Sequence, residues 1–141
     1  MKSFATEIPI RATPEAIWSI LADAAAYPAW NSTVERVEGR IARGETIKVH
    51  ARISPGRAFP VRVTELDPPR RMVWTGGMPL GLFTGTRTFT LAPRSDGMVA
   101  FAMGETFTGL LAPLIARSIP DLQPAFDAFA ADLKRRAESG G

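Results

Sequence analysis

The chain contains no cysteine, one histidine and one tyrosine among its 141 residues. The absence of cysteine excludes disulfide bonds, thiolate metal sites and cysteine nucleophiles. One histidine without cysteine also falls short of the ligand set of a usual zinc site, so we expect no bound metal. A cysteine-free chain fits a reducing compartment.

Long apolar runs and standard cofactor motifs are absent as well. The segment Met1–Glu7 has no apolar core long enough for a signal peptide. No stretch approaches the roughly 20 apolar residues that a transmembrane helix needs. We therefore expect a cytoplasmic protein without integral membrane association. The Walker loop, the Gly-x-Gly-x-x-Gly turn, the nucleophile elbow and the His-Glu-x-x-His motif are all missing, so we expect no cofactor.

Charge is nearly balanced despite a basic isoelectric point. The net charge is +3 and the pI is about 9.9, with acidic and basic residues interspersed through most of the chain. The densest basic clusters, Arg70-Arg71 and Lys134–Arg136, are not interleaved with aromatic residues. They do not form a groove that follows phosphates, and we expect no nucleic-acid partner.

The composition is that of one globular domain. The chain is 45% apolar and 22% charged, which is ordinary for a folded soluble domain. We expect a single domain over residues 1–138 and a disordered tail over residues 139–141. Its oligomeric state is left open between a monomer and a homodimer.

Hydrophobic alternation predicts a run of strands after one short helical region. A strand over Phe4–Ile10 leads to a helix with Thr13 as N-cap and Pro14 in its first turn. A second short helical piece is expected before Trp30. Strand-like runs follow at residues 33–40, 45–54, 59–66, 70–75, 83–91 and 98–108, and residues 76–81 read as a flexible or bent connection. The turns between most of these runs are short, which favours antiparallel neighbours.

The last third of the chain predicts a long helix with one apolar stripe. Leu122, Phe126, Phe129 and Leu133 recur at helical spacing. A break is expected around residues 119–121, where Asp121 acts as N-cap and leaves Pro124 in a tolerated early position. The preceding piece, residues 110–118, is expected to be more mobile and to form the lip of a pocket.

Three local patterns in this order resemble the START-like superfamily, also called SRPBCC, which includes the birch-pollen allergen and the polyketide cyclase/dehydrase group. They are Ile8–Trp18, a strand running into a helix; Asp23 followed by Tyr27–Asn31; and Glu105–Leu111, leading into the final helix. The resemblance covers nearly the whole chain. It implies an α+β helix-grip fold, with a seven-stranded curved antiparallel sheet wrapped around the C-terminal helix and two short helices after the first strand. It also implies an apolar cavity beneath that helix. Proteins of this superfamily bind lipids, sterols, polyketides or other hydrophobic molecules, and a minority catalyse reactions.

Two charged residues interrupt apolar strand faces. Arg87 shares a parity with Phe83 and Phe89, and Glu105 shares one with Met103 and Phe107. A tight hairpin at Asp96-Gly97 makes Arg87 and Glu105 diagonal neighbours on the concave face. Either they are a polar fixture, in which Arg87 anchors a ligand and Glu105 orients it or moves a proton, or they are a structural ion pair or turn to solvent. His50 is expected on the outer face.

The remaining candidates are apolar. The expected ligand-binding set combines sheet and helix residues: Phe59, Trp74, Phe83, Arg87, Phe89, Phe101, Met103, Glu105, Phe107, Leu122, Phe126 and Phe129. The alternative is that the apolar members fill an ordinary core. Three functions follow: a carrier of a hydrophobic small molecule (lipid, polyketide or aromatic metabolite), a cofactor-free cyclase or dehydratase, or a protein-interaction module with a filled core.

Overall fold

Within the part of the chain that the structure describes, seven strands form one antiparallel sheet in the order β1-β7-β6-β5-β4-β3-β2. The computed structural model describes residues 2–139. The strands are β1 (Lys2–Ile10), β2 (Val34–Glu38), β3 (Thr46–Ala51), β4 (Phe59–Asp67), β5 (Arg71–Met78), β6 (Phe83–Pro93) and β7 (Val99–Thr108). The first strand joins the sheet beside the last, and the others follow as a meander, which confirms the predicted antiparallel arrangement.

Short helices and one long helix complete the chain. They are α1 (Pro14–Leu21), η1 (Ala24–Ala26), α2 (Tyr27–Trp30), α3 (Ala112–Ile115), η2 (Ala116–Ser118) and α4 (Gln123–Glu138). The start of α1 matches the prediction, because the Thr13 hydroxyl oxygen accepts a hydrogen bond from the Ala16 N–H at 3.1 Å and Pro14 occupies the first turn.

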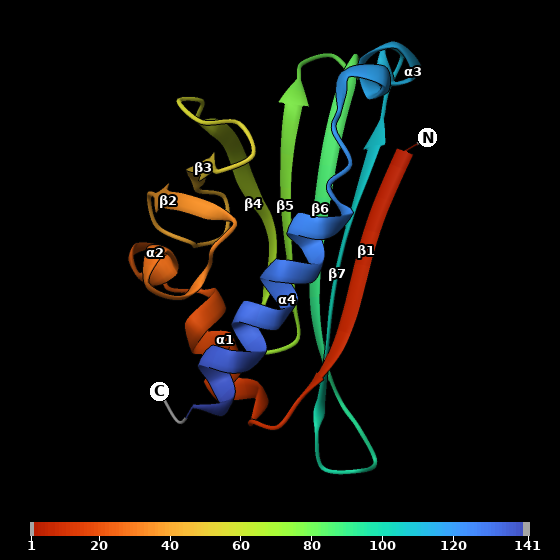
Figure 1. The fold of residues 1–141 in the computed structure, drawn as a ribbon. Coiled ribbons are helices and arrows are strands. Elements are labelled where there is room, and N and C mark those ends of the chain that lie inside the picture. Colours follow the sequence, from red (N-terminus) through yellow and green to blue (C-terminus); the bar gives the residue numbers. More distant parts are fainter. Residues whose placement is uncertain (1, 140–141) are drawn as a thin grey trace.

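The sheet is curved, and α4 runs obliquely across its concave face (Figure 1). Helices α1 and α2 lie at one end of the sheet, beside the C-terminal half of α4. We call this the helical end. The turns 52–58 and 79–82 and the segment 109–118 lie at the opposite end, the turn end, where α4 does not reach. The expected helix-grip arrangement is confirmed.

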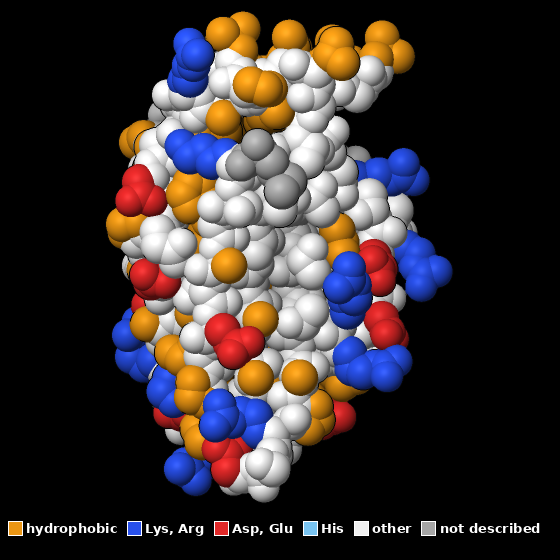
Figure 2. Space-filling view, turned by 90° about the vertical axis from the view of Figure 1, so that its right-hand side faces the viewer, with side chains coloured by type: hydrophobic (Ala, Val, Ile, Leu, Met, Phe, Trp, Pro, Cys, Tyr) orange, Lys and Arg blue, Asp and Glu red, His pale blue; other side chains and the backbone are white. Residues whose placement is uncertain are grey.

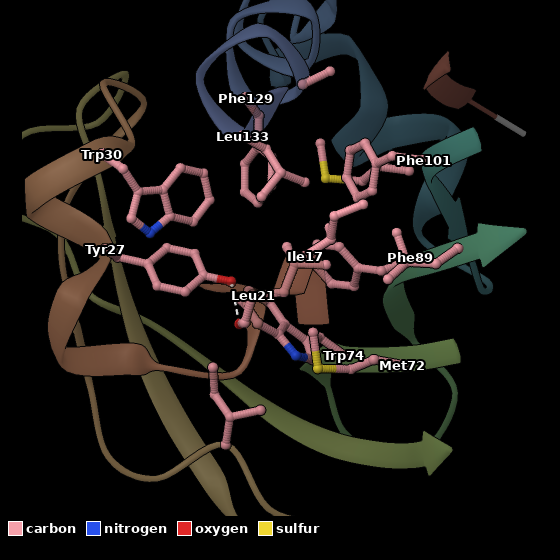
Figure 3. Packing of buried hydrophobic residues seen from close by; sticks show 14 of the residues in the cluster. Ile17, Leu21, Tyr27, Trp30, Met72, Trp74, Phe89, Phe101, Phe129 and Leu133 are labelled. Carbon is pink, nitrogen blue, oxygen red and sulfur yellow. Dashed lines mark hydrogen bonds between the residues drawn. The ribbon is translucent and has the colours of Figure 1, made fainter. Parts of the chain in front are cut away.

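The core sits between α4 and the helical end of the sheet. Phe89, Phe101 and Leu133 are fully buried and Phe129 is 2% exposed. Figure 3 shows these side chains converging from the sheet and from α4, with Tyr27 and Trp30 closing one side. The apolar stripe predicted for the C-terminal helix is thus buried against the sheet. Burial of these aromatic side chains stabilises the fold.

Two strand details differ from the sequence-based expectations. Residues 76–78, expected as a connection, belong to β5, and Gly76 and Gly77 pair with Gly85 and Thr84 of β6. Glycine here marks close backbone approach, since a Cβ at Gly76 would lie 2.9 Å from the Pro60 carbonyl oxygen. Strand β6 also extends to Pro93, which shifts the register against β7 by two residues.

The break before α4 is confirmed, and its cap differs from the prediction. Helix η2 ends at Ser118, Ile119 is extended, and α4 begins at Gln123 with Leu122 as N-cap. The Asp121 carboxylate still accepts a hydrogen bond from the Gln123 N–H at 3.1 Å. At the other terminus Ser139 is the C-cap of α4. The rest of the expected tail, Gly140 and Gly141, lies outside the described residues.

Candidate functional site

Arg87 and Glu105 form an ion pair on the concave face of the sheet. The corrected register places them directly opposite each other on β6 and β7 rather than diagonally. The Arg87 Nε–H donates to Glu105 Oε1 at 2.6 Å, and the two side chains are 23% and 15% exposed. The pair is therefore mostly buried, with a small part of each side chain still exposed.

The Arg87 guanidinium also lies over an aromatic ring. Its central carbon is 4.8 Å from the centroid of Phe126, on the first turns of α4. This cation–π contact fixes the plane of the guanidinium while leaving its edge free. Among the described residues, Glu105 is the only hydrogen-bond partner of the Arg87 side chain. A guanidinium has five N–H donors, so the terminal nitrogens retain donors for another acceptor.

Three of the apolar candidates are only partly buried. Phe59 and Phe83 belong to the sheet, Leu122 precedes α4, and all three are half-buried. Next to the pair, Gly76 and Gly85 face each other across β5 and β6. A Cβ at Gly85 would lie 3.2 Å from the Phe107 ring and 3.7 Å from Glu105 Oε2, so the bare backbone there forms the floor beside the carboxylate.

The helical half of the concave face is filled by side chains instead. Phe101 and Phe129 stack with their centroids 6.2 Å apart, and Phe89 lies 6.0 Å from Phe129. Trp74 meets Phe89 edge-on at 4.7 Å. Of the twelve predicted binding residues, the structure thus places Trp74, Phe89, Phe101, Met103, Phe107, Phe126 and Phe129 in buried positions and leaves Phe59, Phe83, Arg87, Glu105 and Leu122 partly exposed.

Three polar groups lie in or near the buried core, and of the residues that carry them only Trp74 was among the predicted binding residues. The indole N–H groups of Trp30 and Trp74 are buried and have no partner within residues 2–139. The Tyr27 hydroxyl donates to the Leu21 carbonyl oxygen at 2.7 Å. Burial raises the pKa of Tyr27 far above its usual value, and the nearby Arg87 charge offsets this only in part. Tyr27 therefore stays neutral and structural. No sequence pattern distinguishes these indoles from ordinary core residues.

His50 lies outside this site, on the face opposite the one that carries Ile47. Its Nε2 is 3.5 Å from Glu38 Oε2. The Arg36 side chain, together with His50, lowers the pKa of Glu38 through hydrogen bonding. Within the described part of the chain, no cluster of three acidic or histidine side chains is close enough to hold a metal ion.

Two shallow hollows lie away from the ion pair. One, of about 410 Å³, is on the outer face of β1, β6 and β7, and the other, of about 390 Å³, lies between the start of α1 and the β6–β7 turn. Neither lies beneath α4. None of the helices in residues 2–139 is long and apolar enough to cross a membrane.

The fold and a family model together show the class of protein to which this chain belongs. The chain belongs to the family described as polyketide cyclase / dehydrase and lipid transport, which matches residues 1–138. It is therefore a START-like domain, and family membership supports a ligand-binding or cyclase-type role. A comparison with curated proteins finds no match in sequence.

Solved structures share the fold at low identity. A START superfamily protein from Mycobacterium smegmatis is 16% identical, with a TM-score of 0.69 and 99% of each chain covered. Protein MLL2253 from Mesorhizobium loti is 19% identical, with a TM-score of 0.77 and 99% of each chain covered. DynU16, a protein of the dynemicin biosynthetic locus, is 16% identical with a TM-score of 0.73, over 99% of this chain and 48% of that one. At these identities the likeness shows the fold alone.

Proposed function

We propose that this protein binds a hydrophobic small molecule that carries an acidic or carbonyl group. The supporting observation is Arg87: it lies on an apolar concave face, is held by Glu105 at 2.6 Å and by the Phe126 ring, and retains free N–H donors. The ligand's apolar part lies against Phe59, Phe83 and Leu122, and its oxygen accepts from Arg87. The ligand enters from the turn end, where these side chains are half-buried.

The ion pair gives this site its selectivity. A carboxylate near Arg87 receives a charge-assisted hydrogen bond, which is about twice as strong as a neutral one. An alcohol of the same length buries the same apolar area but receives only the weaker bond. The affinity for an acid should therefore exceed the affinity for the matched alcohol. Glu105 binds the Nε–H of Arg87, which leaves the two terminal nitrogens to donate to the ligand.

The test compares dodecanoate with dodecanol by calorimetry. We expect the wild-type protein to prefer the acid by roughly tenfold, and Arg87→Gln to remove the preference. The matched control is Arg71→Gln, because Arg71 also forms a cross-strand pair, with Glu65 at 2.9 Å, and that pair is half-exposed on the outer face. Equal affinity of wild type and Arg87→Gln for dodecanoate would refute the proposed role of Arg87.

A second candidate is a cofactor-free cyclisation or dehydration at the same place. Glu105 supports it, since a partly buried carboxylate beside a bound carbonyl compound is a usable proton acceptor. Loss of turnover in Glu105→Gln with binding retained would favour this enzyme over a carrier. The filled helical half of the face supports the third alternative, an interaction module. If native mass spectrometry of the purified protein detected no bound small molecule, that result would favour the interaction module.

A further inference from the structure

The turn end carries the most exposed large apolar side chains of the described residues. Leu80 is 94% exposed, Leu110 81%, Leu114 65% and Met78 42%, and Ile53, in the separate turn 52–58, is 46% exposed. Met78 and Leu80 belong to the end of β5 and the β5–β6 turn, and the two other leucines follow β7. Figure 2 shows hydrophobic side chains gathered along this end of the molecule. We call Met78, Leu80, Leu110 and Leu114 the leucine tip.

Backbone hydrogen bonds hold the two halves of the tip together. The Leu110 N–H donates to the Gly81 carbonyl at 3.2 Å, and the Leu111 N–H donates to the Leu82 carbonyl at 2.8 Å. Leu80 itself has a φ of +61°. Glycine or asparagine adopts that conformation at less cost, so the fold does not require a leucine there. The structure holds an apolar side chain outward at the expense of backbone strain.

The segments that build the turn end, residues 52–58, 79–82 and 109–118, carry only basic charges. Lys2, Arg52, Arg57 and Arg117 lie at the turn end, and none of them forms an ion pair within residues 2–139. The segments 46–64, 68–95 and 106–120 contain no Asp or Glu. The Lys2 ammonium donates to the Ile119 carbonyl at 3.0 Å, which ties one of these charges to the segment that carries the tip.

We propose that the leucine tip docks on an anionic lipid surface. Protruding leucines flanked by basic residues insert among lipid head groups while the charges remain at the anionic interface. Contact through this end between two copies of the chain would bring four positive charges against four, which disfavours a symmetric dimer there. The inference builds on the proposed function, because the same end gives access to Arg87 and a docked tip would let an apolar ligand pass without crossing water.

The test uses the absence of cysteine from the chain. A single cysteine at position 114 or 95 accepts a polarity-sensitive fluorophore, and Ser95 lies in the β6–β7 turn at the helical end. With vesicles of phosphatidylcholine and phosphatidylserine, we expect a blue shift for Leu114→Cys and none for Ser95→Cys. With phosphatidylcholine alone, and with the mixed vesicles at high salt, both labels should stay unchanged or nearly so.

Vesicle sedimentation then separates the apolar and the charged contributions. Leu80→Asn removes the side chain but suits the left-handed backbone, so it should fold normally and bind about tenfold more weakly. Leu110→Ser gives an independent check if Leu80→Asn proves unstable. Arg117→Glu should also weaken binding by about tenfold. Its control, Arg40→Glu, makes the same charge change at an 80% exposed side chain at the helical end and should bind normally.

Several outcomes would overturn the proposal. They are no binding of the wild-type protein to the mixed vesicles, equal binding by Leu80→Asn and Leu110→Ser, or a blue shift at position 114 that needs concentrated protein rather than lipid. The last would assign the tip to a contact between copies. Arg87→Gln should bind vesicles as the wild type does, so failure of the ligand site and failure of the docking surface are recorded separately.

Discussion

At the scale of single residues, Asp132 is the buried charge that fastens α4 to the helical end. It is 6% exposed, and its Oδ2 accepts from the Ser32 N–H at 2.8 Å and the Ser32 hydroxyl at 2.7 Å. Arg135 donates to its Oδ1 at 2.6 Å. Burial raises the pKa of Asp132, but the hydrogen bonds from Ser32 and Arg135 outweigh this and hold the pKa below its usual value.

This geometry predicts a pH-dependent contribution to stability. A carboxylate with a lowered pKa in the folded state stabilises the fold fully above its unfolded value of about 3.9 and loses that contribution as pH falls through the lower, folded value. Asp132→Asn should cost about 1–3 kcal/mol at neutral pH and should flatten the dependence of urea midpoints on pH below 4. The exposed Asp127→Asn on the same helix is the control. If the urea midpoints of Asp132→Asn fell below pH 4 as steeply as those of the wild type, Asp132 would not be the source of this pH dependence.

Sequence reasoning identified Arg87 and Glu105 as a pair because each interrupts an apolar strand face. It could not decide how tightly they interact, since that depends on the register of β6 and β7. The stabilising role of Asp132 escaped it, because Ser32 is 100 residues away in the chain. The residues next to Asp132 in α4 give no sign that its hydrogen-bond partner is Ser32.

At the scale of elements, the junction between β7 and α3 depends on Gly109. Its φ is +116°, and a Cβ there would lie 2.7 Å from the Leu82 carbonyl oxygen and 2.8 Å from that of Gly81. The two turns that build the leucine tip approach each other here. Both the backbone conformation and the close packing therefore require glycine.

Gly109→Ala should consequently destabilise the protein more than the same substitution at a glycine that also has a positive φ but has no neighbouring atoms where the Cβ would lie. Gly56 is the matched control, because its φ is +78° and nothing lies within 4 Å of a Cβ built there. Gly56→Ala should cost about 1 kcal/mol from backbone strain alone. The loss of stability in Gly109→Ala should be larger than in Gly56→Ala by about 1 kcal/mol or more, because the carbonyl groups of Gly81 and Leu82 must also move. Chemical denaturation of both variants gives the comparison, and equal losses would show that the turns can separate freely.

Some boundaries of helices and strands can be predicted from local sequence patterns, and others cannot. The cap of α1 was predictable because Thr13 and Pro14 act through adjacent backbone groups. The end of β5 was not, since Gly76 and Gly77 read as turn residues unless the partner strand is known. The tight hairpin was predicted two residues out of register, because Ala92 and Pro93 continue β6 without a distinctive alternation.

At the scale of the whole molecule, the two ends of the sheet differ in packing. The helical end contains the aromatic core beneath α4, whereas the turn end leaves Phe59, Phe83 and Leu122 half-buried. The helix-grip layout was predictable from the order of strands and the apolar stripe of α4. The division into a fully buried half and a partly buried half was not, because it depends on how far along the sheet α4 begins.

This division predicts how a ligand should change amide hydrogen exchange. In the free protein, amides of β6 and β7 near Phe89 and Phe101 should exchange most slowly, and those near residues 83–85 and 106–109 much faster. Bound dodecanoate should slow exchange mainly in the second group, because the ligand covers the turn end and contributes little to a core that is already closed. Exchange measured with and without dodecanoate tests this, and dodecanol at equal occupancy serves as the control. If slowing were concentrated around Phe101 and Phe129 instead, the ligand would enter beneath α4, and the core rather than the Arg87 side of the sheet would be the binding site.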